Sequence, residues 1–395
     1  MRMFKALSLA AVLALSLLPA ANAEVPATFS FSGAGYGHGV GMSQIGAKVR
    51  ALNGESATEI LNYYYKDVLI APIVDTQTIR VNLANAVKTV SFVSVTPDSV
   101  IDIFIGDIGE STDVIPALSL TTRQKARFRV VDGLATFAGL AGNAFTIRWS
   151  GPDAVMTFRE PGEKARYRYG QMQIKIIRGA MAVTNSLRLR DEYLLGISEV
   201  PSSWPPAALE AQVIASRSFA LAKLGNIRPS CDCHVFDHIS DQNFVGYSKE
   251  IEPRFGQNWR VAVARTHIDS ETSLAILANG KPVPAFYSSS SGGATQSTRD
   301  AWGQATSHTH SVPDPASLDL EHNPRFASWT ANTTQALAAT AFLLPNIVSL
   351  EILTRNEAGA VTSIKGIAMD GSYKVLRGDT FRSRVKIPSP YFDLT

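Results

Sequence analysis

The chain has 395 residues, of which 45% are hydrophobic and 18% charged, an ordinary composition for a globular protein. Its formal net charge is only +3, whereas nucleic-acid binding normally needs a clustered basic stripe, so nucleic acid is not an expected partner. Two cysteines are too few for a scaffold held together by disulfides, and the fold must therefore depend on an apolar core.

Residues 1–23 have the pattern of an export signal. Arg2 and Lys5 precede an apolar run, and Ala21-Asn22-Ala23 has the small-x-small form that signal peptidase accepts. The run is shorter than the roughly 20 apolar residues of a spanning helix. We therefore expect a secreted or cell-envelope protein, with an uncleaved anchor as the alternative.

Residues 24–75 are expected to begin with a short strand at 28–32. Glycines on alternate positions of the segment 33–47 then prevent a stable helix. Helical spacing follows from 42 to 52, and Ser56-Ala-Thr-Glu59 is a capping box that opens a second helix. This part of the chain is therefore expected to contain a helical hairpin.

From about residue 77 to residue 185 the apolar residues alternate with polar ones. The segments TIRVNLA, TVSFVSV, VIDIFIG, KARFRVV, AFTIRWS, VMTFRE and QMQIKII are separated by Asp, Gly, Pro and Asn turns. The pattern predicts about seven strands. We place a β-rich accessory domain at 76–165, as a scaffold or a carbohydrate-binding surface.

Helical periodicity returns at Asp191, stops at Pro201, and resumes in the segment 205–223, which Gly225 closes. The helix at 205–223 has an apolar face and is expected to be buried. A polar loop, a short helix, strands and a final helix follow, so 166–395 is expected to be an α+β domain that mixes helices and sheet.

Three separated segments carry a joint signature. Residues 185–220 contain NSLRLRDEYLLGISEVP and then PAALEAQVIASRSFA, residues 285–293 are AFYSSSSGG, and residues 35–47 are GYGHGVGMSQIGA, with ILNYYY at 60–65. Together they resemble the motifs of the SpoIID/LytB family, named for stage II sporulation protein D and an amidase-associated wall protein. The resemblance covers roughly residues 169–395 and the N-terminal segment.

The order of the segments departs from the family pattern. The glycine-histidine segment normally follows the closing strand, whereas here it precedes everything else, as in a circular permutation. We therefore expect 24–75 to pack on the catalytic domain, with His38 folded back against the domain that carries Glu199. A second departure is Ser288, where the family commonly has histidine.

The resemblance implies a peptidoglycan lytic transglycosylase in which Glu199 is the catalytic acid and base. Such a reaction needs one carboxyl group, because the sugar's own 6-hydroxyl attacks the anomeric carbon and leaves a 1,6-anhydro end. The resemblance implies glycan strands as the substrate, in particular strands whose stem peptides have been removed. No cofactor is required for this chemistry.

A hydrolase would instead need a partner acid roughly 5 to 9 Å from Glu199. Asp241, Asp300 and Glu192 are candidates, and nothing in their spacing favours one of them. Glu199 has apolar neighbours, among them Ile197 and Trp204, and these are expected to raise its pKa.

The resemblance also implies a substrate groove. Arg217 is expected either at this groove or in a structural ion pair, His38 either lines the groove or caps the backbone, and the serine-glycine loop either binds sugar or forms a plain turn. The full set of candidate substrate-binding residues is His38, Gln44, Gln212, Arg217, Gln242, Tyr287, Ser289, Ser291, Gly292 and Gly293.

Cys231, Cys233, His234 and His238 contain enough soft ligands for a structural zinc ion. The C-x-C spacing is shorter than that of common zinc sites, and export permits oxidation, so a disulfide stays open as the alternative.

The competing function is a non-catalytic amidase enhancer of the LytB type, which would hold glycan for an N-acetylmuramoyl-L-alanine amidase without cutting it. A zinc peptidase is disfavoured because the sequence has no H-E-x-x-H pair.

Overall fold

The structure is a computed structural model that describes residues 25–160 and 162–395. The predicted export signal lies outside the described residues. The fold mixes helices with a larger share of strands, as expected for an α+β protein. Among the described residues, no helix is both long and apolar enough to cross a membrane.

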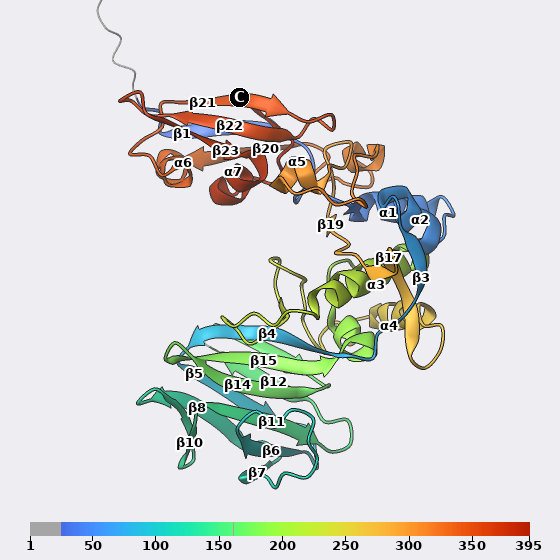
Figure 1. The fold of residues 1–395 in the computed structure, drawn as a ribbon, viewed down its shortest axis with the longest axis vertical. Coiled ribbons are helices and arrows are strands. Elements are labelled where there is room, and N and C mark those ends of the chain that lie inside the picture. The colour runs from blue at the N-terminus through green and yellow to red at the C-terminus, as the bar shows by residue number, and fades with distance from the viewer. Residues whose placement is uncertain (1–24, 161) are drawn as a thin grey trace, which may run out of the picture.

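A β-rich module is built from two sheets and occupies one end of the molecule (Figure 1). Its strands are β4 (Thr78–Val87), β5 (Thr89–Ser94), β6 (Val100–Ile105), β7 (Leu118–Thr121), β8 (Lys125–Val131), β9 (Leu134–Phe137), β10 (Leu140–Gly142), β11 (Ala144–Ser150), β12 (Met156–Glu160), β13 (Glu163–Tyr167), β14 (Gln171–Ile177), β15 (Ala180–Arg188) and β16 (Val235–Phe236). One sheet has the order β16-β4-β15-β14-β11-β6-β7 and the other β10-β9-β8-β5-β12-β13.

The two sheets share one core. Phe128 of β8 and Phe145 of β11 lie 5.0 Å apart between ring centroids, and both are fully buried. All seven predicted strands are present, but the sheet continues through β14 and β15 past residue 165, where the sequence suggested a domain boundary. The sequence did not predict β15 because residues 180–187 are all buried, which removes the alternation of apolar and polar residues.

The buried helix predicted at 205–223 is the centre of a helical layer, and its residues 211–220 are all buried. It contacts both helices of the N-terminal hairpin and a small sheet of order β18-β17-β3. The elements of this layer are α1 (Gln44–Leu52), α2 (Ala57–Tyr64), β3 (Leu69–Val74), η1 (Leu189–Tyr193), η2 (Leu194–Gly196), α3 (Pro206–Lys223), α4 (Gly256–Arg265), β17 (Thr272–Ala278) and β18 (Lys281–Pro282).

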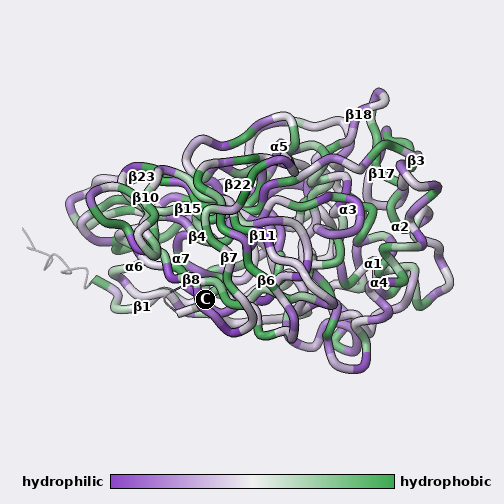
Figure 2. The backbone as a smooth tube through the Cα atoms, turned by 90° about the horizontal axis from the view of Figure 1, so that it is seen from below, coloured by the Kyte–Doolittle hydropathy of each residue, from purple (hydrophilic) through white to green (hydrophobic). Residues whose placement is uncertain are grey.

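The two ends of the described chain meet in a third region. Its elements are β1 (Thr28–Gly33), β2 (Met42–Ser43), β19 (Tyr287–Ser288), α5 (Thr298–Trp302), η3 (Pro315–Leu318), β20 (Trp329–Thr334), α6 (Gln335–Phe342), β21 (Ser349–Arg355), β22 (Val361–Ile367), β23 (Tyr373–Arg377), α7 (Gly378–Val385) and β24 (Phe392–Leu394). Strand β1 lies between β20 and β24, and β2 pairs with β19. Figures 1 and 2 place β1 and α6 on the opposite side of the molecule from α1, α2 and β17.

The alternating glycines before α1 have a physical explanation. Gly35, Gly37, Gly39 and Gly41 all have positive φ, between 72° and 105°. A Cβ at Gly41 would come within 2.0 Å of the Phe286 carbonyl oxygen. Only glycine combines this backbone conformation with such a close approach, and the segment 35–41 therefore follows the strand that carries Tyr287.

Candidate active site

Glu199 lies in the turn between η2 and α3. The sequence predicted a helix from Asp191 to Pro201, but η1 and η2 are single turns. The chain leaves the helical path at Ile197, which bridges to the loop that follows β16. The N–H of Ser198 then donates to the Asn243 carbonyl at 2.8 Å. Glu199 is therefore held on an extended segment against this loop.

The Glu199 carboxyl is half-buried and has two hydrogen-bond partners. The backbone N–H of Asn243 donates to Oε1 at 2.7 Å, and the side chain of Tyr287 is the second partner. Burial raises the pKa of Glu199, and the two hydrogen bonds oppose this rise without cancelling it. A raised pKa keeps a larger fraction of the carboxyl protonated, as a general acid requires.

The neighbours of Tyr287 determine where its hydroxyl can donate its proton. It accepts a hydrogen bond from Gln242 Nε2 at 2.7 Å, and Gln242 Oε1 in turn accepts from the hydroxyl of Tyr193 at 2.8 Å. Because the Gln242 amide occupies a lone pair, the Tyr287 proton can be donated to Glu199. Burial raises the pKa of Tyr287 well above its usual range, so the hydroxyl keeps that proton.

Three glutamines that the sequence predicted to bind substrate are connected to Tyr287 through hydrogen bonds. Ser216 contacts the Tyr287 hydroxyl, Gln212 Nε2 donates to Ser216 Oγ at 3.0 Å, and Gln44 Nε2 donates to Gln212 Oε1 at 3.2 Å. Gln44, Gln212 and Gln242 are all buried. The structure brings them together with Tyr287, but as residues that fix its position, because a buried side chain cannot reach a glycan.

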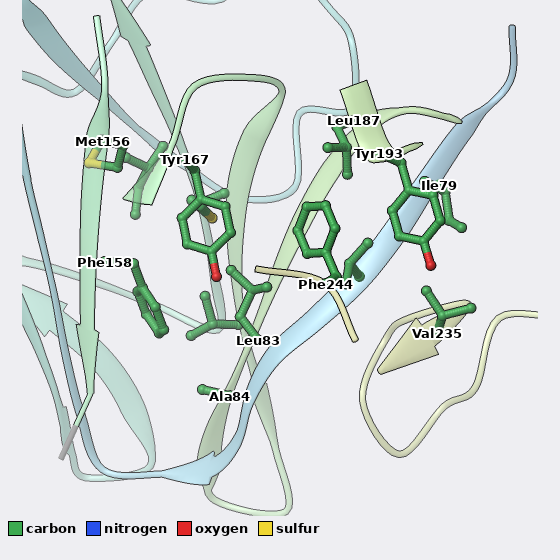
Figure 3. Packing of buried hydrophobic residues seen from close by; sticks show 14 of the residues in the cluster. Ile79, Leu83, Ala84, Met156, Phe158, Tyr167, Leu187, Tyr193, Val235 and Phe244 are labelled. Atoms are coloured by element: carbon green, nitrogen blue, oxygen red, sulfur yellow. The ribbon is translucent and has the colours of Figure 1, made fainter. Parts of the chain in front are cut away.

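Phe244 connects this site to the β-rich module. Figure 3 shows its ring between those of Tyr167 and Tyr193. The ring centroids are 6.1 Å apart for the pair with Tyr167 and 5.3 Å for the pair with Tyr193, and both pairs are stacked. The loop that carries Asn243 is therefore anchored to both neighbouring parts of the fold.

Sequence reasoning missed Asn243 and Tyr193. Asn243 acts through its backbone N–H, which any residue except proline supplies, so its side chain carries no signal. Tyr193 stands in the same motif as Glu199, and this proximity was the one available hint.

The prediction that Arg217 reaches the groove is wrong. Its side chain is fully buried and its Nε donates to Asp75 Oδ2 at 2.8 Å. Arg190 pairs with the other oxygen of the same carboxylate at 3.0 Å. Two guanidinium groups therefore share Asp75, and the structural ion pair considered from the sequence is the alternative that the structure supports.

His38 lies beside the serine-glycine loop rather than in hydrogen-bond contact with Glu199. Its Nδ1 accepts from the N–H of Val40 at 3.0 Å, which is the local backbone cap considered from the sequence. Its ring is 5.1 Å from that of Trp302. Burial lowers the pKa of His38 to about 4, against the opposing effect of Asp379, so the ring is neutral near pH 7.

The donors of the serine-glycine loop are largely used within the protein. Ser291 is buried and donates to Asp314 Oδ2 at 2.7 Å, and the N–H of Gly293 donates to Ser291 Oγ at 3.2 Å. A Cβ on Gly292 would meet the Tyr391 ring at 2.3 Å. The plain-turn alternative therefore fits Ser291, Gly292 and Gly293 better than sugar binding, whereas Ser289 stays half-buried next to the site.

The cysteine loop contains a disulfide between Cys231 and Cys233. His234 Nδ1 accepts from the N–H of Arg80 at 2.9 Å, and His238 Nδ1 accepts from Ser240 at 3.3 Å. Among residues 25–160 and 162–395, no group of three or more His, Cys, Asp or Glu side chains is arranged to hold a metal. The disulfide alternative thus fits this structure, and the zinc alternative does not.

The carboxylates considered as partners of Glu199 each accept hydrogen bonds from other residues. Asp241 accepts two hydrogen bonds from Arg228, each at 2.7 Å, and its side chain is almost fully buried. Asp300 is bound at the start of α5, where the hydroxyl of Ser297 donates to it at 2.9 Å. Glu192 accepts from a backbone N–H within its own turn at 2.8 Å.

Comparison with known proteins agrees with the resemblance found in the sequence. Residues 178–270, which include Glu199, match the SpoIID family described as Stage II sporulation protein. The chain is 25% identical over 207 residues to the amidase enhancer of Bacillus subtilis strain 168, and 28% identical over 132 residues to stage II sporulation protein D of the same strain. A third relative, stage II sporulation protein D of Bacillus amyloliquefaciens, is 21% identical over 292 residues.

These matches cover 48%, 32% and 67% of this chain, respectively. They span 26% of the amidase enhancer, 38% of the first sporulation protein and 80% of the second. Residues 178–270 therefore carry the match to the SpoIID family, and the resemblance recognised from the motifs is confirmed.

Proposed function

We propose that this protein is a peptidoglycan lytic transglycosylase and that Glu199 is its general acid and base. The observation that carries the proposal is the state of Glu199. It is a half-buried carboxyl with a raised pKa, held by Asn243 and Tyr287, inside the region that matches the SpoIID family.

The reaction uses one carboxyl group twice. Protonated Glu199 donates its proton to the glycosidic oxygen as the bond to the anomeric carbon breaks, and the leaving sugar departs as an alcohol. The Glu199 carboxylate then takes the proton of the muramyl 6-hydroxyl, whose oxygen bonds to the anomeric carbon. The product is a 1,6-anhydro ring, no water is consumed, and Glu199 is protonated again.

The surroundings of Glu199 fit this reaction, which needs no second carboxylate. An inverting or retaining hydrolase needs a second carboxylate roughly 5 to 9 Å from the first. Asp241 and Asp300, two of the three candidates, are bound to Arg228 and Ser297, respectively. Tyr287 and Asn243 supply neutral donors, which stabilise the carboxylate formed after proton donation without acting as a second acid.

We further propose that the protein works outside the cytoplasm, in the cell envelope. The export pattern of residues 1–23 supports this location. The disulfide between Cys231 and Cys233 fits it as well, because disulfides persist mainly in oxidising compartments.

Mass spectrometry of the products tests the reaction. Purified protein is incubated with intact sacculi and with peptide-stripped glycan strands, beside Glu199→Gln. We expect 1,6-anhydro-muramyl ends that disappear in the variant. Products heavier by one water would show hydrolysis and contradict the proposal. The matched control is Glu210→Gln, since Glu210 is on α3 and is paired with Arg265 at 3.5 Å.

The second candidate function is enhancement of an amidase without cleavage. It is favoured by the match to the amidase enhancer, which extends over 48% of this chain. Under this function the protein would bind glycan and accelerate release of stem peptides by an added N-acetylmuramoyl-L-alanine amidase. Glu199→Gln would keep that acceleration, whereas under the first function it abolishes the activity of the protein itself.

A further inference from the structure

A groove of about 780 Å³ lies between the β-rich module and the loop that holds Glu199. We call it the module groove. Its walls come from β4, the β12–β13 hairpin and the loop after β16. The apolar residues that line it include Leu83, Phe158 and Phe244, and the polar ones include Asn85, Lys164 and Ser248.

The module groove borders the candidate active site at Asn243. Asn243 lines the groove, and its backbone N–H is the group that holds Glu199 Oε1 at 2.7 Å. Asp237, in the same wall, lies close to Tyr193. The negative charges of Asp237 and Glu199 therefore both act on the Tyr193 hydroxyl. Burial, and then these charges together with that of Asp241, raise the pKa of the Tyr193 hydroxyl.

We propose that the module groove binds the glycan strand on one side of the bond that Glu199 breaks. This inference rests on the proposed function and adds the β-rich module to the substrate site. The groove has the volume of pockets that enclose small ligands, enough for roughly two sugar residues.

The chemistry of the groove suits sugars. Sugar rings have apolar faces, which can pack on the stacked rings of Phe236 and His238, since Phe236 is half-buried and His238 is exposed at the groove. Amide and hydroxyl groups at the rim match hydroxyl and acetamido substituents. A peptide-free muramyl residue also has a free carboxylate, for which Lys164 is an exposed cationic partner at the rim. The acidic residues Glu160 and Asp237 already have interactions within the protein.

A glycan is favoured over a stem peptide by the position of the groove. A strand that is cut in its interior must continue from the active site in both directions. A groove that shares Asn243 with Glu199 is therefore placed for the next sugars along the strand, whereas a stem peptide branches away from it.

The test measures binding, so that it does not depend on cleavage. In the Glu199→Gln protein, the dissociation constant for a peptide-free hexasaccharide of alternating N-acetylglucosamine and N-acetylmuramic acid is measured with and without Lys164→Ala or Ser248→Trp. Ser248→Trp fills the groove with a bulky ring, and we expect it to weaken binding about tenfold or more, with a smaller loss for Lys164→Ala.

Matched controls are Lys125→Ala on β8 and Ser270→Trp in the loop before β17. Both residues are exposed and do not line the groove, so binding should change less than twofold. Thermal unfolding of each variant shows whether the fold is kept. Lys164→Ala, at an exposed position, keeps the test valid if Ser248→Trp unfolds.

Unchanged hexasaccharide binding in both folded groove variants would overturn the proposal. So would variants that weaken binding of a soluble stem peptide while leaving the hexasaccharide unaffected, since the groove would then be a peptide site. If the groove variants weaken hexasaccharide binding but the unmodified protein cuts no glycan, the groove assignment holds and the transglycosylase function is the part that fails.

Discussion

Asn243 holds Glu199 through its backbone and not through its side chain, since its N–H donates to Glu199 Oε1 at 2.7 Å while its Nδ2 donates to the Ser198 carbonyl. Tyr287, by contrast, contacts Glu199 through its hydroxyl. Side-chain substitutions at the two positions should therefore affect Glu199 differently.

Glu199→Gln should lower the rate of glycan cleavage by about 10²- to 10⁴-fold, because the amide cannot donate the required proton. Release of anhydro-muramyl ends from peptide-stripped strands measures the rate. Glu210→Gln should keep the rate within about twofold, since Glu210 lies at the surface of α3. A Glu199→Gln protein that is folded and fully active would rule out this residue as the acid.

Cleavage should decrease as the pH rises through the raised pKa of Glu199, because only the protonated carboxyl is an acid. In Tyr287→Phe the carboxylate loses a hydrogen bond that stabilises its charged form. The pKa of Glu199 then rises further, and the decreasing limb of kcat/KM should move to higher pH.

Asn243→Ala is the matched variant for this pH profile. It keeps the backbone N–H on Glu199, so the decreasing limb should stay where it is, even if loss of the Ser198 contact lowers the rate. A limb that moves to lower pH in Tyr287→Phe would contradict the proposed hydrogen bond.

Asp75→Asn should destabilise the protein strongly, by about 3–5 kcal/mol in free energy of unfolding, because it leaves two buried guanidinium groups without their counter-charge. Chemical denaturation measures this loss. The control is Asp191→Asn, which breaks an exposed pair with Arg188 and should change the free energy of unfolding by less than about 1 kcal/mol. If the two substitutions lower the free energy of unfolding by similar amounts, the buried cluster of Asp75, Arg190 and Arg217 stabilises the protein no more than an exposed pair does.

Removal of metal should not affect the protein. We expect an intact mass that is two hydrogens lower under non-reducing than under reducing conditions, and a chelator should leave the thermal unfolding midpoint unchanged. Stoichiometric zinc in the purified protein, with free thiols at Cys231 and Cys233, would restore the zinc alternative.

The sequence predicted strands and helices where one face is buried and the other exposed, as in β8, whose residues alternate between buried and exposed. It failed for β15, where all residues from 180 to 187 are buried, and for η1 and η2, where a helical pattern gives way to a bridge between Ile197 and the following loop. In both cases tertiary contacts decide the conformation, and local periodicity does not report them.

The same distinction holds for the candidate site. Motifs led to Glu199, Tyr287 and the glutamines, since these residue types stand out within a recognisable pattern. They could not separate residues that touch substrate from residues that position others. Gln242 and Arg217 are both long and polar, yet both are fully buried, and only the fold shows this.

Strand β1 pairs on one side with β20 and on the other with β24, so that Phe31 faces both Ala331 and Leu394 in the ladder. Strand β1 therefore cannot complete its sheet until residues 392–394 have been synthesised. Pairings so distant in sequence slow folding. Since the parallel pairing of Met42 with Tyr287 lies just beyond this strand, the candidate active site should become ordered late in folding.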